Sequence, residues 1–324
     1  MNMTDVLRRY EPDLRQVEEH LGRYLHSEVP FIPQVINHLI SSGGKRFRPL
    51  MLLASADLCG YRGERRYPLS AVIEFIHTAT LLHDDVVDGA ETRRGRPSAN
   101  NVWGNASVVL VGDFLYSRSF TLMTRDGDLA IIQLISETTN TMAEGEVFQL
   151  LKCGDAGITE EDYFTLIEKK TAVLIAAACA VGALMAGASP DRVEALRAFG
   201  HAMGLAFQLT DDTLDYVAAE KEFGKAIGMD IREGKITLPL IRTLARCTAG
   251  EKETIRGIVE RKQATDEDIA AVFGLIGKYD GIPYALDRAR TIIADGKARL
   301  APFRDGEAKA ALLAMADFIA ERTL

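Results

Sequence analysis

The chain has 324 residues, of which 47% are hydrophobic and 26% charged, a composition typical of a folded globular protein rather than a disordered one. Its formal net charge is −8, whereas a nucleic-acid-binding domain carries a basic excess, so no nucleic-acid partner is expected. The four cysteines, Cys59, Cys153, Cys179 and Cys247, form no CxxC pair, which argues against a zinc site or disulfide framework and fits the reducing cytoplasm.

Hydrophobic residues recur at helical spacing along the whole chain, and no alternating β-branched run is bounded by hairpin turns. The first twenty residues are charged and lack an apolar core, so no signal peptide is expected. Short loops are expected at five places: residues 42–44, 60–68, 95–104, 154–157 and 221–237. No Pro/Ser-rich linker divides the chain, which predicts one all-α domain over residues 1–324.

The first motif in chain order is DDVVD, formed by Asp84, Asp85 and Asp88 after the apolar helical stretch 71–82. Positions i and i+4 share one face of a helix, so Asp84 and Asp88 point the same way. Like charges at this spacing repel each other unless a cation lies between them. One such cluster alone is explained equally well by a solvated helix end and by a metal site.

An uncharged stretch rich in Ala and Gly, residues 172–188, is shorter than a usual membrane span. We expect a buried helix whose small residues allow close packing, with a transmembrane segment as the minor alternative. Helix starts carry plausible caps: Thr159 and Thr265 precede acidic residues, and Ser189 precedes Pro190.

The second motif is DDTLD, formed by Asp211, Asp212 and Asp215 after the apolar stretch 204–209. Mg²⁺ prefers one or two carboxylates plus phosphate oxygens to a cage made only of protein ligands. Two copies of the motif, each after an apolar stretch, favour metal binding over two solvated helix ends. The two clusters together are expected to hold one diphosphate through several Mg²⁺ ions. An EF-hand is excluded because the Gly and Glu of its loop are missing.

Basic residues gather beside both motifs. They are Lys45, Arg46 and Arg48 after a Gly-Gly turn, Arg93, Arg94 and Arg96 after DDVVD, Lys169 and Lys170 before the Ala-rich stretch, and Lys225 and Lys235 after DDTLD. Arg binds phosphate in bidentate fashion and Lys acts as a mobile charge. Each alone is best explained as a solvated charge, but their shared placement favours diphosphate binding. His77 lies on the same helix face as Asp84, which favours a substrate contact over a buried structural role.

The ordered motifs IEFIHTATLLHDDVVD, RRG, GEVFQL, KKTAVLI, FQLTDDTLDY and GKAIGMDIREGKITLPL resemble those of trans-type polyprenyl diphosphate synthases, most closely long-chain bacterial octaprenyl diphosphate synthases. The resemblance implies an orthogonal helix bundle around a deep central cavity, in a Mg²⁺-dependent homodimer. It implies that isopentenyl diphosphate is condensed with an allylic diphosphate, such as farnesyl diphosphate, into an all-trans chain of about forty to fifty carbons for a quinone. At most a peripheral membrane contact is expected, for product release.

The resemblance also implies roles for matching residues. The Mg²⁺ ligands are Asp84, Asp88 and Asp211, supported by Asp85, Asp212 and Asp215. The isopentenyl diphosphate site matches Lys45, Arg48, His77 and Arg94. The allylic diphosphate site matches Arg93, Lys170, Lys225 and Lys235, with Thr171 and Gln208 as polar groups near the developing carbocation. The C-terminal tail lacks the basic signature of some short-chain relatives.

Small residues one turn before Asp84, Ala79 and Thr80, stand where bulky aromatics stop growth in short-chain relatives. An extended forty-carbon chain is on the order of 40 Å long, more than the ~30 Å of a 20-residue helix, so a long tunnel is expected. Met123 matches a floor position of octaprenyl enzymes and is equally well explained as core filling.

Three alternatives remain at this point. One is a shorter-chain synthase making roughly fifteen or twenty carbons, because motifs alone do not measure a tunnel. A second is a non-catalytic subunit of a heteromeric synthase, against which the two intact aspartate motifs argue. The third is a terpene cyclase, which needs no isopentenyl diphosphate site and is therefore disfavoured by the motif GGKRFRP.

Overall fold

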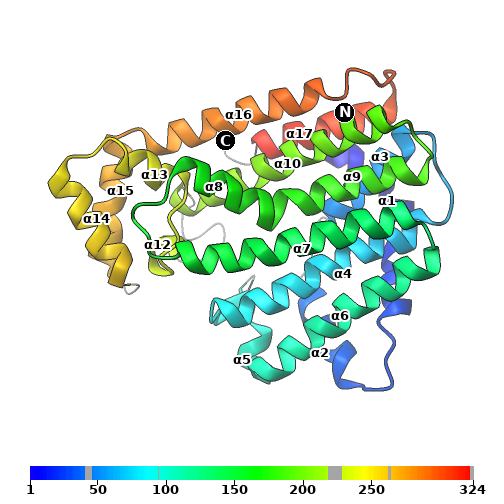
Figure 1. Cartoon of the computed structure of the whole chain (residues 1–324), viewed down its shortest axis with the longest axis horizontal. Helices are drawn as coiled ribbons and strands as arrows, with labels where there is room; N and C mark the ends of the chain where they lie inside the picture. The colour runs from blue at the N-terminus through cyan, green and yellow to red at the C-terminus, as the bar shows by residue number, and fades with distance from the viewer. Residues whose placement is uncertain (41–45, 94, 218–227, 262–263, 322–324) are drawn as a thin grey trace. The chain divides into compact units, whose positions relative to one another are not determined.

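The computed structural model describes residues 1–40, 46–93, 95–217, 228–261 and 264–321. Nearly all of its described elements are helices (Figure 1). Three predicted site residues, Lys45, Arg94 and Lys225, lie outside the described residues. The chain divides into two compact units. Unit 1 comprises Met1–Thr139, Leu174–Gly200 and Arg299–Met315, and unit 2 comprises Asn140–Val173, His201–Ala298 and Ala316–Leu324.

The elements follow one another as a long series of helices with one small hairpin. The N-terminal elements are α1 (Met3–Tyr24), α2 (Phe31–Ile40), α3 (Phe47–Leu58), α4 (Arg66–Val87), β1 (Thr92–Arg93), β2 (Arg96–Pro97), α5 (Ala99–Trp103) and α6 (Asn105–Asp126). The central elements are α7 (Leu129–Lys152), α8 (Glu160–Ile167), the π-helix η1 (Glu168–Ala172), α9 (Val173–Met185) and α10 (Pro190–Val217). The C-terminal elements are α12 (Met229–Arg232), α13 (Leu238–Leu244), α14 (Ala249–Arg261), α15 (Asp266–Lys278), α16 (Gly281–Ala298) and α17 (Glu307–Glu321).

Unit 1 is built around α4, which is buried along most of its length and packs against α6, α1 and α3. Figure 1 shows α4 and α6 running side by side. The Ala-rich helix α9 belongs to the same core, and its Gly182 lies so close to α3 that a Cβ there would be 2.6 Å from the carbonyl oxygen of Leu52. The predicted buried helix with close packing is therefore confirmed. Within the described ranges, no helix is both long enough and apolar enough to cross a membrane.

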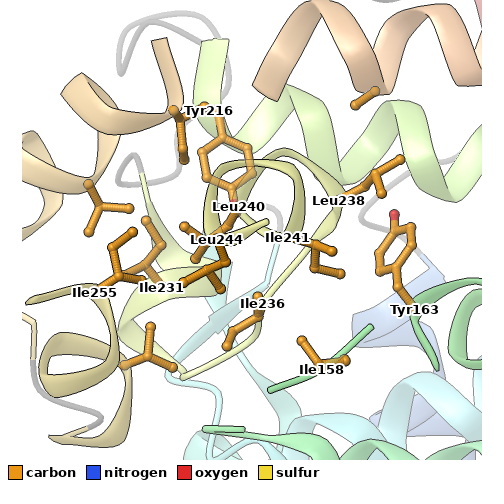
Figure 2. Close-up of a cluster of buried hydrophobic side chains, with 14 of the residues drawn as sticks. Ile158, Tyr163, Tyr216, Ile231, Ile236, Leu238, Leu240, Ile241, Leu244 and Ile255 are labelled. Carbon is orange, nitrogen blue, oxygen red and sulfur yellow. The ribbon is translucent and has the colours of Figure 1, made fainter. Parts of the chain in front are cut away.

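Unit 2 has its own hydrophobic core, part of which Figure 2 shows. Its labelled members are Ile158, Tyr163, Tyr216, Ile231, Ile236, Leu238, Leu240, Ile241, Leu244 and Ile255. The short apolar helix α13 packs against α8, α15 and α16. The cluster thus joins α8, the C-terminal turn of α10 and the segment that contains α12, which between them carry the second aspartate motif and its neighbours.

The predicted helix starts are confirmed. The side chains of Thr159 and Thr265 each accept a hydrogen bond from the backbone N–H three residues on, and in both cases the reciprocal bond completes a capping box. Helix α10 begins at Pro190, as predicted.

Three of the predicted loops contain more structure than expected. The described part of the predicted loop 221–237 contains the short helix α12. Helix α4 already begins at Arg66, inside the predicted loop 60–68. The predicted loop 95–104 contains β2 and α5, and β2 pairs with β1 in an antiparallel hairpin in which Thr92 lies opposite Pro97. Strands of two residues are too short to show the alternation by which a strand is predicted from sequence.

A buried ion pair anchors the start of α3. Arg46 has a left-handed backbone (φ 46°), a conformation that is strained for a residue other than Gly and needs support from its surroundings. Its guanidinium donates to Glu18 at 2.6 Å and to Glu74 at 2.8 Å. The Glu74 side chain is only 8% exposed, whereas that of Glu18 is 47% exposed. Arg46 is therefore engaged by two structural partners, Glu18 and Glu74.

Glu74→Ala is expected to lower the free energy of unfolding by roughly 3 kcal/mol, because it leaves a mostly buried guanidinium without its buried partner. Glu18→Ala removes the exposed partner of the same guanidinium and is the matched control, with an expected loss of less than about 1 kcal/mol. Urea unfolding of the two variants measures both values. Equal losses would show that the buried pair has no special part in anchoring α3.

Candidate active site

The first aspartate motif lies at the C-terminal end of α4. Asp84 is half-buried in the last turn, and Asp88 is the half-buried C-cap, whose N–H donates to the carbonyl oxygen of Asp84 at 2.8 Å. The i, i+4 spacing predicted from the sequence is therefore kept. A helix C-terminus carries partial negative charge, so three carboxylates gathered there are mutually unfavourable without a compensating cation. This end of α4 is electrostatically suited to a metal ion.

Asp85, between these two, is fully buried and bound to Arg93 of β1. The Arg93 Nε donates to Asp85 Oδ1 at 2.6 Å. Burial raises the pKa of Asp85, and the Arg93 guanidinium opposes the rise. The second oxygen, Oδ2, is buried and has no hydrogen-bond partner among the described residues. The structure thus brings Arg93 to the first motif and leaves Asp85 Oδ2 without a donor from the described part of the chain.

The other predicted residues of unit 1 lie on α3, α4 and α6. Arg48 is half-buried in the first turn of α3, and His77 is half-buried on α4. Thr80 is partly exposed, and its hydroxyl donates to the carbonyl oxygen of His77 at 2.9 Å. Ala79 and Met123 are 0% exposed. In the part of the chain that the structure describes, neither of these two side chains therefore touches a space large enough for water.

The second aspartate motif lies in the last two turns of α10, in unit 2. Asp211 is exposed, and Asp212 and Asp215 are half-buried. Both oxygens of Asp212 accept hydrogen bonds, Oδ2 from the Tyr163 hydroxyl at 2.6 Å and Oδ1 from Gln208 Nε2 at 2.7 Å. Burial raises the pKa of Asp212 to about 6, although both hydrogen bonds oppose the rise. Burial also raises the pKa of Tyr163, so its hydroxyl keeps its proton and donates.

A fourth carboxylate beside this motif was given no role in the sequence prediction. Asp230 is the second residue of α12, and its N–H donates to Asp215 Oδ2 at 3.2 Å. Burial, followed by the charges of Asp212 and Asp215, raises the pKa of Asp230 well above its usual range, and Lys235 opposes the rise. The signal was present in the motif GMDIREGK, which was used only for the family resemblance. Four acidic side chains therefore crowd one end of α10, which again suits a cation.

Lys170 and Thr171 lie in the π-helix η1, between α8 and α9. Lys170 Nζ donates to Glu146 of α7 at 2.8 Å, and the Thr171 hydroxyl donates to Gln208 Oε1 at 2.8 Å. Lys235 forms an ion pair with Glu233 at 2.8 Å. π-helical turns are rare and frequently occur at functional sites. Unit 2 thus brings Thr171, Gln208 and Asp212 together through hydrogen bonds.

The donor set fits Mg²⁺. No group of three or more His, Cys, Asp or Glu side chains within the described ranges is arranged to hold a metal ion by itself. A Mg²⁺ ion completed by diphosphate oxygens needs only one or two carboxylates from the protein. The aspartates at the ends of α4 and α10, together with Asp85 Oδ2, would offer hard oxygen ligands to such an ion at two places.

Similarity to known proteins identifies the family to which these motifs belong. The family model of polyprenyl synthetase matches residues 29–276. The octaprenyl diphosphate synthase of Escherichia coli K12 is 43% identical over 261 residues, which cover 81% of this chain and 81% of the relative. A solved polyprenyl synthase from Caulobacter crescentus CB15, complexed with calcium and isoprenyl diphosphate, is 41% identical, with a TM-score of 0.95 over 100% of this chain and 98% of that chain.

A solved decaprenyl diphosphate synthase from Rhodobacter capsulatus is 39% identical, with a TM-score of 0.95 over 99% of each chain. Together with the helices described above, these matches confirm the predicted all-α class. They also confirm the resemblance that the sequence motifs predicted. The chain belongs to the polyprenyl synthetase family.

Proposed function

We propose that this protein condenses isopentenyl diphosphate with an allylic diphosphate, such as farnesyl diphosphate, into a long all-trans polyprenyl diphosphate. The observation that carries the proposal is the presence of two intact aspartate motifs, each beside basic residues, in a chain of the polyprenyl synthetase family. Family membership confirms the prediction of a prenyltransferase. Relatives named octaprenyl and decaprenyl diphosphate synthases support a product of about forty to fifty carbons, and a quinone side chain is its proposed use.

Asp84, Asp88 and Asp211 would hold Mg²⁺, with Asp85, Asp212 and Asp215 in support. When bound there, Mg²⁺ would supply positive charge to offset the negative charge that develops when an allylic diphosphate departs. The relative from Caulobacter crescentus, whose structure contains calcium and isoprenyl diphosphate, supports a divalent cation in this role. Asp230 is proposed as a further carboxylate of the same site.

The chain's own residues bind and orient the two substrates. Isopentenyl diphosphate is assigned to Lys45, Arg48, His77 and Arg94. The allylic diphosphate is assigned to Arg93, Lys170, Lys225 and Lys235. Fixed cations are most effective where charge builds in the transition state. The double bond of isopentenyl diphosphate attacks C1 of the allylic cation, and the released pyrophosphate accepts the proton that is then lost. Thr171 and Gln208 offer the cation weak dipoles without a strong nucleophile.

We also propose that the chain forms one helical domain and acts in the cytoplasm as a homodimer. At most a peripheral membrane contact is proposed. Helix α7 carries three exposed hydrophobic residues at i, i+3 and i+4, namely Val147, Leu150 and Leu151, which are 59%, 57% and 74% exposed. This apolar stripe supports a surface that a second copy covers.

Leu151→Asp is therefore expected to shift the protein toward the monomer, because it places a charge in that stripe. Analytical ultracentrifugation at several concentrations measures the shift. Leu129→Asp is the control, since Leu129 is 79% exposed on the same helix but lies outside the stripe. A sedimentation profile that is the same for both variants and the unaltered protein would contradict the assignment of this surface.

Incubation with labelled isopentenyl diphosphate, farnesyl diphosphate and Mg²⁺, followed by chromatography of the products, tests the proposed function. We expect a labelled product of about forty to fifty carbons. A product of fifteen or twenty carbons would identify a shorter-chain synthase, and a cyclic hydrocarbon a terpene cyclase. No product alone, with activity restored by a second protein, would identify a non-catalytic subunit.

A further inference from the structure

In unit 2, Thr171 and Gln208, which are assigned to the allylic substrate, belong to a continuous chain of hydrogen bonds. The chain ends at the buried Tyr163. The Thr171 hydroxyl donates to Gln208 Oε1 at 2.8 Å, and Gln208 Nε2 donates to Asp212 Oδ1 at 2.7 Å. The Tyr163 hydroxyl donates to the other oxygen, Asp212 Oδ2, at 2.6 Å. Tyr163 therefore contacts Asp212 directly and is the last group of this chain of hydrogen bonds. The sequence motifs assign Tyr163 no role.

The chemistry of the four groups fixes the direction of the chain. An ionised carboxylate only accepts hydrogen bonds, so Gln208 must turn its amide nitrogen to Asp212 and its oxygen to Thr171. The single proton of the Thr171 hydroxyl is then used to donate to Gln208. What Thr171 offers to its remaining surroundings is therefore the lone pairs of its oxygen and not its proton.

The local structure directs Thr171 toward Gln208. A threonine in an α-helix commonly donates to a carbonyl oxygen of the preceding turn. Thr171 lies instead in the π-helix η1, and its hydroxyl donates to α10. The side chain is only 6% exposed, so the interaction takes place away from bulk water, where dipoles act more strongly.

Tyr163 holds the far end of the chain in place. It is 1% exposed and belongs to the hydrophobic cluster of unit 2 (Figure 2). Its ring packs edge-on against Phe164, with centroids 5.7 Å apart, and it stands in the first turn of α8 behind the capping box of Thr159. A group so constrained fixes the position of the carboxylate that it binds.

We propose that Tyr163 is a positioning residue of the prenyl-transfer site: it and Asp212 set the direction of the hydrogen-bond chain, so that Thr171 presents oxygen lone pairs to the allylic cation. This inference rests on the proposed function, because it needs a cation to stabilise. Lone pairs aimed in advance at developing positive charge lower the barrier without reorganisation. A proton aimed at the same place would raise it.

Tyr163→Phe is the first test, and Tyr216→Phe is its matched control. Both tyrosines are buried in the same cluster, but the Tyr216 hydroxyl is bonded to Thr237 Oγ1 at 2.7 Å and not to an aspartate. We expect Tyr163→Phe to lower kcat about tenfold, with both KM values changed less than about twofold. Tyr216→Phe is expected to lower kcat less than about threefold. Equal kcat values for the two variants would overturn the proposal.

A second pair keeps the test valid if Tyr163→Phe fails to fold. Thr171→Val and Thr213→Val each remove one buried threonine hydroxyl, but that of Thr213 donates only to the Leu209 carbonyl within α10, at 2.7 Å. We expect kcat to fall about tenfold or more for Thr171→Val and less than about threefold for Thr213→Val. Thr171→Ser, which keeps the oxygen, is expected to restore most of the loss. Failure of Thr171→Ser to do so would overturn the role of the lone pairs.

A third measurement distinguishes the effect of the hydrogen-bond chain on kcat from an effect on metal binding. In Asp212→Asn the amide can turn either its nitrogen or its oxygen to Gln208, so the direction of the chain is no longer fixed. We expect kcat to fall, while Mn²⁺ affinity in the presence of inorganic pyrophosphate, followed by electron paramagnetic resonance, changes less than about threefold. A loss of Mn²⁺ affinity as large as that of Asp211→Asn would make Asp212 a metal ligand and overturn its positioning role.

If the unaltered protein makes no prenylated product, the proposed function itself fails, and that outcome is seen before any variant is compared.

Discussion

Replacing Asp84 or Asp211 with alanine is expected to lower kcat about 10³-fold or more while the helical fold survives. The loss follows because each variant removes a carboxylate to which we assign Mg²⁺ at the leaving diphosphate, and a single charge-stabilising interaction is worth several kcal/mol in the transition state. The fold survives because Asp84 is half-buried and Asp211 is exposed. Removing one of several like charges near a helix C-terminus even relieves repulsion. Steady-state kinetics and thermal unfolding by circular dichroism measure the two effects.

Asp191→Ala is the control for Asp211→Ala. Asp191 is exposed in the first turn of the same helix, α10, far along the chain from the motif. Its loss removes a favourable charge at a helix N-terminus, which costs at most about 1 kcal/mol of stability and leaves kcat unchanged. Near-normal turnover in both Asp84→Ala and Asp211→Ala would refute the assignment of the motifs to Mg²⁺.

Ala79→Tyr is expected to shorten the product from about forty or more carbons to about fifteen or twenty, because a large side chain one turn before Asp84 would stop the growing chain. Ala79 is 0% exposed, so the tyrosine also has to displace neighbouring side chains, at a cost of roughly 1–3 kcal/mol in stability. Chromatography of the products after removal of the diphosphate, together with the melting temperature, measures both effects.

Thr80→Tyr is the companion variant for the same question. Thr80 is partly exposed, so a larger side chain there is accommodated with less overpacking, and shortening of the product is again expected. If both variants fold and both still make the full-length product, growth does not pass this level of α4, and the explanation of product length is wrong.

Local features of the fold were predictable from the sequence because they depend on residues close together in the chain. The capping boxes at Thr159 and Thr265, the start of α10 at Pro190 and the buried, closely packed α9 all follow from short-range patterns. The β1–β2 hairpin was missed because its strands are too short to produce a pattern.

The contacts that complete the candidate site were not predictable in this way. Tyr163 and Asp212 are 49 residues apart, and Lys170 and Glu146 are 24 residues apart. No periodicity connects such pairs, because tertiary packing alone brings them together. Tyr163 is a buried aromatic residue, and its sequence context is that of ordinary core filling. Asp212 could therefore be selected from its sequence motif, whereas its donor Tyr163 could be found only from the fold.

Capture of an allylic diphosphate is proposed to depend on Mg²⁺. Titration calorimetry with the unreactive thiolo-analogue of farnesyl diphosphate, in buffer containing either Mg²⁺ or a chelator, measures this dependence. We expect tight binding with Mg²⁺ and at least about a hundredfold weaker binding without it. We also expect Asp84→Ala and Asp211→Ala to bind the analogue weakly under both conditions. Equally tight binding with and without Mg²⁺, unaffected by either substitution, would contradict the proposed dependence on Mg²⁺.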